Sequence, residues 1–186
     1  MHKLRTIEMS RLTVGEFKAS PKIPLVVVLD DVRSAYNVGS VFRTGDAFRI
    51  ERVCLCGITA TPPSAEIHKT ALGGEDSVDW TYYKDTADCV AALHDRGYSV
   101  WSVEQVEHSV KLNRLDEVPI PGADGHGGVA VVFGNELKGV RQDIIDMSDA
   151  CLEIPQFGTK HSLNVSVTAG IVIWEFARRL MASLRG

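Results

Sequence analysis

The sequence predicts an α/β fold with a mostly parallel sheet and helices on both faces. Continuous apolar, β-branched runs at 23–30 and 128–133 are typical of strands that are buried on both sides. Other segments carry apolar residues at helical spacing, and strand and helix alternate along the whole chain. Such alternation is the pattern of parallel strands joined by right-handed helical crossovers.

The first half of the chain divides into an arm and the start of the sheet. Residues 1–22 are predicted to form an N-terminal arm with one short helix, and residues 23–186 a single domain. A polar connection leads from the first strand into a helix of about three turns that ends near Phe48. We then expect a strand at 50–56, a break at Pro62-Pro63, a short helix at 64–72 and a strand at 78–83.

The second half continues the alternation. A helix over 86–96 is predicted to stop at Gly97, because glycine readily adopts the conformation that ends helices. We expect strands at 98–104, 128–133 and 150–154, a loop rich in proline and glycine at 119–128, a helix at 140–147, and a long last helix from about 163 to 184 that carries Arg178 and Arg179 near its end.

The composition bounds the class of protein. The 186 residues are 45% hydrophobic and 24% charged, which is ordinary for a globular domain. No apolar run approaches the roughly 18–20 residues of a membrane span, and the N-terminus lacks the apolar core of a signal peptide, so we expect no membrane association and a cytoplasmic location. The net charge of −4 argues against capture of nucleic acid by bulk charge, although residues 1–22 carry five basic and two acidic side chains.

The cysteines and histidines do not form a metal-binding pattern. Cys54-x-Cys56 is too closely spaced for the usual zinc pair, and no second pair follows. Both cysteines lie in an apolar run, where a free thiol acts as a small core residue. The six histidines are scattered, so we expect structural thiols and no metal site.

The familiar motifs of nucleotide-binding and hydrolytic enzymes are also missing. The sequence has no G-x-G-x-x-G after a strand, no phosphate-binding G-x-x-x-x-G-K-[ST] and no G-x-S-x-G. In parallel sheets the ligand binds beyond the carboxyl ends of the strands. Three loops with unusual polar content follow strand ends there, at 30–37, 134–139 and 155–162.

Each of these regions offers candidate side chains with a structural and a functional interpretation. Arg43 lies among apolar residues, so it either pairs with Glu136 or an aspartate or faces an anionic ligand, because burying a bare charge is costly. Asn37 is suited to a simple helix N-cap. Glu136 either orients Arg43 or caps the next helix. The turn Gly158-Thr-Lys-His-Ser162 is either a plain loop or a site where backbone amides hold a small ligand.

Three motifs together resemble those of the SpoU (TrmH-like) family of RNA 2′-O-ribose methyltransferases, in the SPOUT superfamily. The resemblance covers about residues 24–180, and the order and spacing of the motifs match together. The motifs are Asn37-Val-Gly-Ser-Val-Phe-Arg43, Phe133-Gly-Asn-Glu136 with Gly139, and Ile154-Pro followed by Ser162-Leu-Asn-Val-Ser166.

This resemblance implies an α/β domain whose C-terminal segment is threaded into a trefoil knot. It implies a homodimer with the active site near the subunit interface. It also implies S-adenosylmethionine as the cofactor, held by backbone contacts from Gly134, Ile154 and Leu163 in one pocket formed by the turn at 155–162 and the loop after Phe133.

The reaction implied is methyl transfer from S-adenosylmethionine to a ribose 2′-hydroxyl in a structured RNA, with tRNA slightly favoured over rRNA. The resemblance makes Arg43 the catalytic arginine, either as general base or as a clamp on an RNA phosphate. It places Asn37 and Glu136 as its positioning partners. The remaining residues implied at the reacting end of the cofactor are Ser162 and Asn164, and the candidates for RNA contact, by charge alone, are Arg11, Lys18 and Arg33.

Two other classes of function remain alternatives. A non-catalytic RNA-binding or ribosome-assembly factor could share the fold, but the motif residues are all intact, which argues against it. A small-molecule α/β enzyme that uses a nucleotide is disfavoured because the phosphate-loop signatures are absent.

Overall fold

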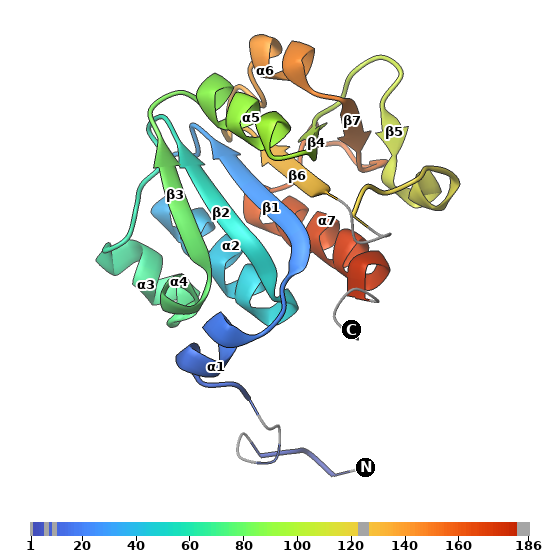
Figure 1. The fold of residues 1–186 in the computed structure, drawn as a ribbon. Helices are drawn as coiled ribbons and strands as arrows, with labels where there is room; N and C mark the ends of the chain where they lie inside the picture. Colours follow the sequence, from blue (N-terminus) through green and yellow to red (C-terminus); the bar gives the residue numbers. More distant parts are fainter. Residues whose placement is uncertain (1, 6–7, 9–10, 123–126, 182–186) are drawn as a thin grey trace.

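The computed structural model describes residues 2–5, 8, 11–122 and 127–181. These residues form one seven-stranded sheet in which every pair of neighbouring strands is parallel (Figure 1). The strands, in the spatial order β3-β2-β1-β6-β4-β7-β5, are β3 (Asp79–Tyr83), β2 (Ile50–Cys56), β1 (Ile23–Asp30), β6 (Gly128–Phe133), β4 (Tyr98–Val103), β7 (Ala150–Glu153) and β5 (Val110–Lys111).

Helices cover both faces of this sheet, as predicted. One face packs against α2 (Ala35–Phe48) and α7 (Val165–Leu180), and the other against α5 (Thr86–Asp95) and α6 (Gln142–Met147). Alternate residues of β1 therefore enter different cores, because successive side chains of a strand point to opposite faces. The remaining helices are α1 (Val14–Ala19), α3 (Ala65–Ala71), α4 (Gly74–Ser77) and the 3₁₀ segment η2 (Leu112–Glu117).

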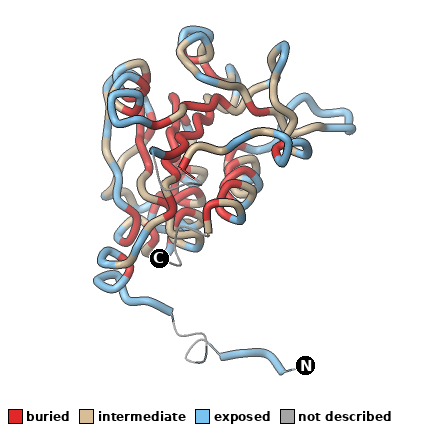
Figure 2. The backbone as a smooth tube through the Cα atoms, turned by 45° about the vertical axis from the view of Figure 1, so that its right-hand side comes forward, coloured by how far each residue is buried: buried red, intermediate tan, exposed pale blue. Residues whose placement is uncertain are grey.

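The burial pattern confirms the prediction of doubly buried strands. All six residues of β6 are buried, and in β1 only the second residue, Pro24, is not. The buried trace runs through the centre of the molecule, with exposed backbone at the loops (Figure 2). Cys54, Cys56 and Cys89 are free, buried thiols within the core cluster beneath α5.

Several boundaries differ from the sequence-based expectations. The last helix begins at Val165 rather than 163, because the Asn164 side chain caps it by accepting from the backbone N–H groups of Ser166 and Val167. Residues 182–184 of the expected helix, and 123–126 of the expected loop, lie outside the described residues. The strand β5 and the segment η2 were not predicted, because such short elements show no periodicity.

The arm at the N-terminus packs on the domain through α1. Phe17 is its one buried helical residue and joins the core beneath α2. Thr13 and Glu16 form a reciprocal capping box at the start of this short helix. Lys18 pairs with Asp79 of β3 at 2.9 Å, so part of the basic charge of the arm is neutralised by the domain itself.

Replacing a central aromatic side chain should reveal how strongly α7 is anchored. Phe176 is fully buried and meets Trp101 of β4 edge-to-face with ring centroids 5.8 Å apart. Phe176→Ala should therefore lower the free energy of unfolding by about 3–5 kcal/mol, the usual cost of a large cavity in a packed core. Equilibrium urea denaturation measures this loss in the free energy of unfolding. Ile58→Ala, at a position that is 67% exposed and lies outside α7, is the control, and equal losses in the two variants would contradict this picture.

Candidate functional site

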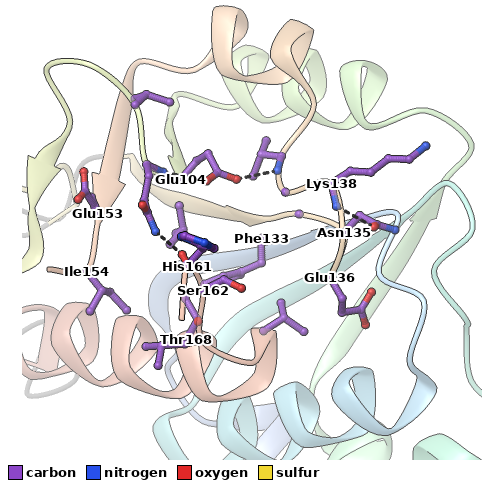
Figure 3. Close-up of a pocket in the computed structure, with 18 of the residues that line it drawn as sticks. Glu104, Phe133, Asn135, Glu136, Lys138, Glu153, Ile154, His161, Ser162 and Thr168 are labelled. Carbon is purple, nitrogen blue, oxygen red and sulfur yellow. Dashed lines mark hydrogen bonds between the residues drawn. The ribbon is translucent and has the colours of Figure 1, made fainter. Parts of the chain in front are cut away.

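A cavity of about 740 Å³ lies at the carboxyl ends of the central strands. Its walls come from the segment after β4, from the loop 134–140 after β6, and from residues 152–165, which run from the end of β7 to the start of α7 (Figure 3). These strands are neighbours in the sheet, so segments far apart in sequence meet at one edge. The volume falls within the roughly 300–1,000 Å³ that is typical of small-molecule sites.

The three residues expected to bind the cofactor all line this cavity. Gly134 belongs to the loop after β6, Ile154 follows β7, and Leu163 precedes α7. Gly134 has no room for a side chain, because a Cβ there would lie 2.1 Å from the carbonyl carbon of Gly139. The loop 134–140 is therefore folded tightly on itself at the cavity wall.

Asn135 gives this loop its shape, and sequence reasoning did not single it out. Its side-chain oxygen accepts from the N–H groups of Leu137 and Lys138 at 2.9 and 3.2 Å, and its amide nitrogen donates to the carbonyl of Asp31 at 2.8 Å. Its backbone pairs with Gly139 in both directions. The sequence did contain a signal for a turn at this position, because asparagine is a frequent turn former.

The far end of the same loop is held by a buried carboxyl group. Asp30, fully buried at the end of β1, accepts from the backbone N–H of Arg141 at 3.3 Å and from the hydroxyl of Thr86 at 2.5 Å. Burial raises the pKa of Asp30 above its usual value, against the opposing effect of these hydrogen bonds. The cavity loop is thus tied to β1 at both of its ends.

Three of the predicted site residues form a continuous chain of hydrogen bonds. Glu136 Oε1 accepts from Asn37 Nδ2 at 3.0 Å, and Asn37 Oδ1 accepts from Asn164 Nδ2 at 3.2 Å. Their motifs are 99 and 127 residues apart in sequence. The fold therefore brings the first, second and third motifs together beside the cavity, which Glu136 and Asn164 line.

Glu136 acts on the start of α2 rather than on Arg43. Its carboxylate accepts from the backbone N–H groups of Arg33 and Ser34 at 2.9 and 3.0 Å. Partial burial would raise its pKa, but these hydrogen bonds and the one from Asn37 outweigh it and hold the pKa below the usual value. A direct pair with Arg43 and a cap on the following helix, both suggested by the residues, were wrong for Glu136. Its expected role in orienting Arg43 stays a prediction.

The expected N-cap role of Asn37 was also wrong. Ser34 is the N-cap of α2, and its hydroxyl accepts from the backbone N–H of Asn37 at 3.4 Å. The Asn37 side chain lies in the first helical turn, where it is free to join Glu136 to Asn164.

Arg43 is exposed, which contradicts the expectation of a buried charge that must be paired. The apolar neighbours that suggested burial are turned inward on α2, whereas Arg43 faces outward. Within the described part of the chain its guanidinium has no hydrogen bond or ion pair, and it does not line the cavity. The structure thus brings Asn37, Glu136 and Asn164 together but leaves Arg43 apart from them.

Ser162 lines the cavity at the turn before α7, as expected, and is exposed. The other polar side chains at the cavity were not predicted. Glu104 and Gln105 directly follow β4 and line the same space. They could have been found, because the rule that ligands bind beyond the carboxyl ends of strands applies to β4 as well.

Two general features of the chain bear on ligand class. Among the side chains that the structure describes, no group of three or more His, Cys, Asp or Glu could hold a metal ion. No helix within the described ranges is long and apolar enough to cross a membrane.

Comparison with known proteins decides the family. A family model described as the SpoU rRNA Methylase family matches residues 24–174. The chain belongs to this family. The prediction from the three sequence motifs is therefore confirmed, and the parallel α/β sheet is the fold of its solved relatives.

Individual relatives of this SpoU family member carry more specific names. The chain is 27% identical over 177 residues to a protein of Vibrio cholerae named 23S rRNA (guanosine-2′-O-)-methyltransferase RlmB, an alignment that covers 95% of this chain and 68% of that one. The AdoMet-bound rRNA methyltransferase of Sinorhizobium meliloti superposes with a TM-score of 0.72 and 26% identity, covering 86% of this chain and 60% of that one. That relative is described as bound to AdoMet (S-adenosylmethionine), the cofactor that the sequence motifs imply.

A third comparison concerns the fold alone. The crystal structure of the A. aeolicus TrmH/SpoU tRNA modifying enzyme superposes with a TM-score of 0.74 at 24% identity, over 91% of this chain and 83% of that one. The trefoil knot, which the resemblance implies, stays a prediction.

Removing the charge of Glu136 should weaken the fold in a pH-dependent way. Because its folded-state pKa lies below the ordinary 4.5, the carboxylate stabilises the protein above that pH and loses this contribution as pH falls through the lower folded value. Glu136→Gln should cost about 2 kcal/mol at neutral pH, the scale of a hydrogen bond to a charged group. Urea denaturation from pH 7 to pH 3 measures the difference in the free energy of unfolding, which should shrink as the pH falls. Glu107→Gln, at an exposed position, is the control. A constant deficit for Glu136→Gln at all pH values would refute the assignment.

Proposed function

We propose that this chain transfers the methyl group of S-adenosylmethionine to the 2′-hydroxyl of a ribose in a structured RNA. The family match and the named relatives support methylation of RNA with this cofactor. The hydrogen bonds that join residues of all three motifs beside one cavity are the observation that carries the proposal. Because its curated relatives are named as rRNA methyltransferases and as a tRNA/rRNA methyltransferase of the TrmH family, either class is a candidate substrate.

The cavity fits the chemistry of the cofactor. S-adenosylmethionine supplies a methyl group on a positively charged sulfonium, which makes it a good methyl donor. Apolar side chains of Ile154 and Leu163 line the cavity together with carboxylates such as Glu104, so it offers contacts for an apolar ring and for positive charge. We assign the backbone of Gly134, Ile154 and Leu163 to cofactor binding.

Ser162 and Asn164 are assigned to the reacting end of the cavity. Asn164 is held by the first turn of α7 on one side and by Asn37 on the other, so its position is defined before RNA arrives. Pre-positioned polar groups of this kind align a hydroxyl for in-line attack without a further ordering cost. Glu136 fixes Asn37 and is therefore a positioning residue in this scheme.

Arg43 is assigned to the RNA. Methylation of a 2′-hydroxyl forms an O–C bond, breaks the S–C bond of the sulfonium and releases the hydroxyl proton to water. An arginine side chain keeps its own proton, but its planar donors bind a phosphate and polarise a neighbouring hydroxyl. An exposed guanidinium without a partner in the described protein is available for such contacts.

Exposure and existing ion pairs also decide which other basic residues are candidates for RNA contact. Arg33 is exposed beside the start of α2, and its side chain is a candidate for RNA contact. Lys18 is less suitable, because it already pairs with Asp79. With a net charge of −4, recognition must depend on a local surface and on RNA shape more than on overall charge.

A second copy of the chain is proposed to cover the outer face of α7. Val167, Ile171 and Trp174 recur there at helical spacing and are 51%, 38% and 49% exposed. Such an apolar stripe on a surface helix is typical of an interface. Asn164 caps the same helix, so a dimer formed on this face would place the site near the subunit boundary, in the cytoplasm where we expect the protein to act.

Loss of Arg43 should strongly lower the rate of methyl transfer without loss of cofactor binding. Arg43→Ala should lower methyl transfer by about a hundredfold or more, the usual effect of removing a group that acts on the reacting hydroxyl. Labelled S-adenosylmethionine is incubated with purified tRNA and, separately, with unmodified rRNA, and nucleoside mass spectrometry identifies any 2′-O-methyl product.

Arg114→Ala serves as the matched control, since Arg114 is an exposed arginine paired with Glu117 on η2. It should retain full activity. If Arg43→Ala were as active as Arg114→Ala, the role assigned to Arg43 would be wrong. If the unchanged protein bound the cofactor but labelled neither RNA, the proposed substrates would be wrong.

Disrupting the apolar stripe should yield a monomer. Ile171→Glu places a charge at its centre, where a covered carboxylate would cost several kcal/mol. Analytical ultracentrifugation should show a dimer for the unchanged chain and a monomer for the variant. Ile58→Glu, at another site that is 67% exposed, should leave the dimer intact, and a monomeric unchanged chain at micromolar concentration would overturn the dimer.

A further inference from the structure

The dipeptide Glu104-Gln105 occupies a special place in the fold. It directly follows β4, which lies between β6 and β7 in the sheet. The loop 134–140 continues from β6, and the segment 154–164 continues from β7, so the two walls of the cofactor cavity rise on either side of this dipeptide. Its backbone is anchored as well, since the Glu104 N–H donates to the carbonyl of Leu152 at 3.0 Å.

Glu104 reaches toward the first wall. Its carboxylate accepts from the backbone N–H of Val140 at 3.1 Å and from that of Gln105 at 2.8 Å (Figure 3). It also presses against Gly139, whose φ is +70° and whose missing Cβ would lie 2.1 Å from Glu104 Oε2. Glycine is required at this bend both for its conformation and for the approach of the carboxylate.

Gln105 reaches toward the second wall. Its side-chain amide donates to the carbonyl oxygen of His161 at 2.8 Å, at the turn that leads into Ser162 (Figure 3). Within the described residues, this is the only hydrogen bond made by residues 155–162. The turn that carries one side of the cavity is otherwise held only by its covalent ends and its packing.

We propose that Glu104 and Gln105 are positioning residues that hold the two walls of the cavity at the separation the cofactor needs, an inference that rests on the cofactor site proposed above. Gln105 orders the turn before the cofactor binds, and Glu104 fixes the bend of the opposite loop. Without them, the cost of ordering these segments is added to binding. Arg43 lies on α2 and does not depend on them, so the chemical step is unaffected once the cofactor is bound.

The test is the affinity for S-adenosylhomocysteine, measured by isothermal titration calorimetry on the full chain. Gln105→Ala removes the side-chain amide, and Gln105→Glu keeps its size but replaces the N–H donor with an acceptor. Both variants should weaken binding by about three- to tenfold, which corresponds to the net contribution of one hydrogen bond. Glu104→Gln should act in the same direction, because its amide nitrogen would face an N–H group that needs an acceptor.

Glu107→Gln is the matched control, because Glu107 is exposed, lies two residues beyond the pair and does not line the cavity. It should bind as the unchanged chain does. In the methylation assay, the Gln105 variants should raise KM for S-adenosylmethionine while kcat stays within about twofold. The melting temperature of Gln105→Ala should match that of the unchanged chain.

The outcomes separate this inference from the one it rests on. If the unchanged chain fails to bind S-adenosylhomocysteine, the proposed cofactor site is wrong. If it binds and the Gln105 variants bind equally well, or lose kcat rather than affinity, the positioning role is wrong.

Discussion

The Glu136 carboxylate joins segments on which the rest of the site depends. It accepts from two backbone N–H groups at the start of α2 and from the Asn37 side chain, and Asn37 in turn holds the residue that caps α7. Hydrogen bonds to an ionised group are stronger than those between neutral groups, so one charge sets the relative positions of two helices and the cavity loop. Partial burial does not neutralise Glu136, because its hydrogen-bond donors hold its pKa below the usual value.

Sheet topology explains why this charge can reach both helices. The strands β1, β6, β4 and β7 are adjacent and parallel, so the segments that follow them all emerge at the same edge. Local patterning predicted these strands, since buried β-branched runs have few other interpretations. It did not predict their spatial order, because order depends on crossovers that no local pattern records. The pairing of Glu136 with Asn37, 99 residues away, therefore came from the resemblance and the fold, not from periodicity.

The wrong expectations share a physical cause. Arg43 was expected to be buried because its sequence neighbours are apolar, but a helix turns by about 100° per residue and can bury those neighbours while exposing the arginine. Asn37 was expected to be an N-cap because asparagine favours that position, yet Ser34, three residues earlier, takes it. Gln105 was overlooked because a lone polar residue after a strand carries no pattern; its importance depends on the turn at 155–162, which only the fold brings near.

Some side chains of the site are held by hydrogen bonds within the described part of the chain, whereas the side chain of Arg43 is not. Hydrogen bonds join Glu136 to Asn37 and Asn37 to Asn164. The Asn135 side chain accepts hydrogen bonds from two backbone N–H groups of the loop 134–140. Arg43 has no such partner within the described protein and is exposed. A positive charge already paired inside the protein would have to break that pair before it bound a phosphate, whereas an unpaired one gives up only its contacts with water. For an acidic chain proposed to act on a polyanion, an exposed arginine without an ion pair in the described protein offers a local positive charge to a phosphate, although the net charge of the chain gives no general attraction.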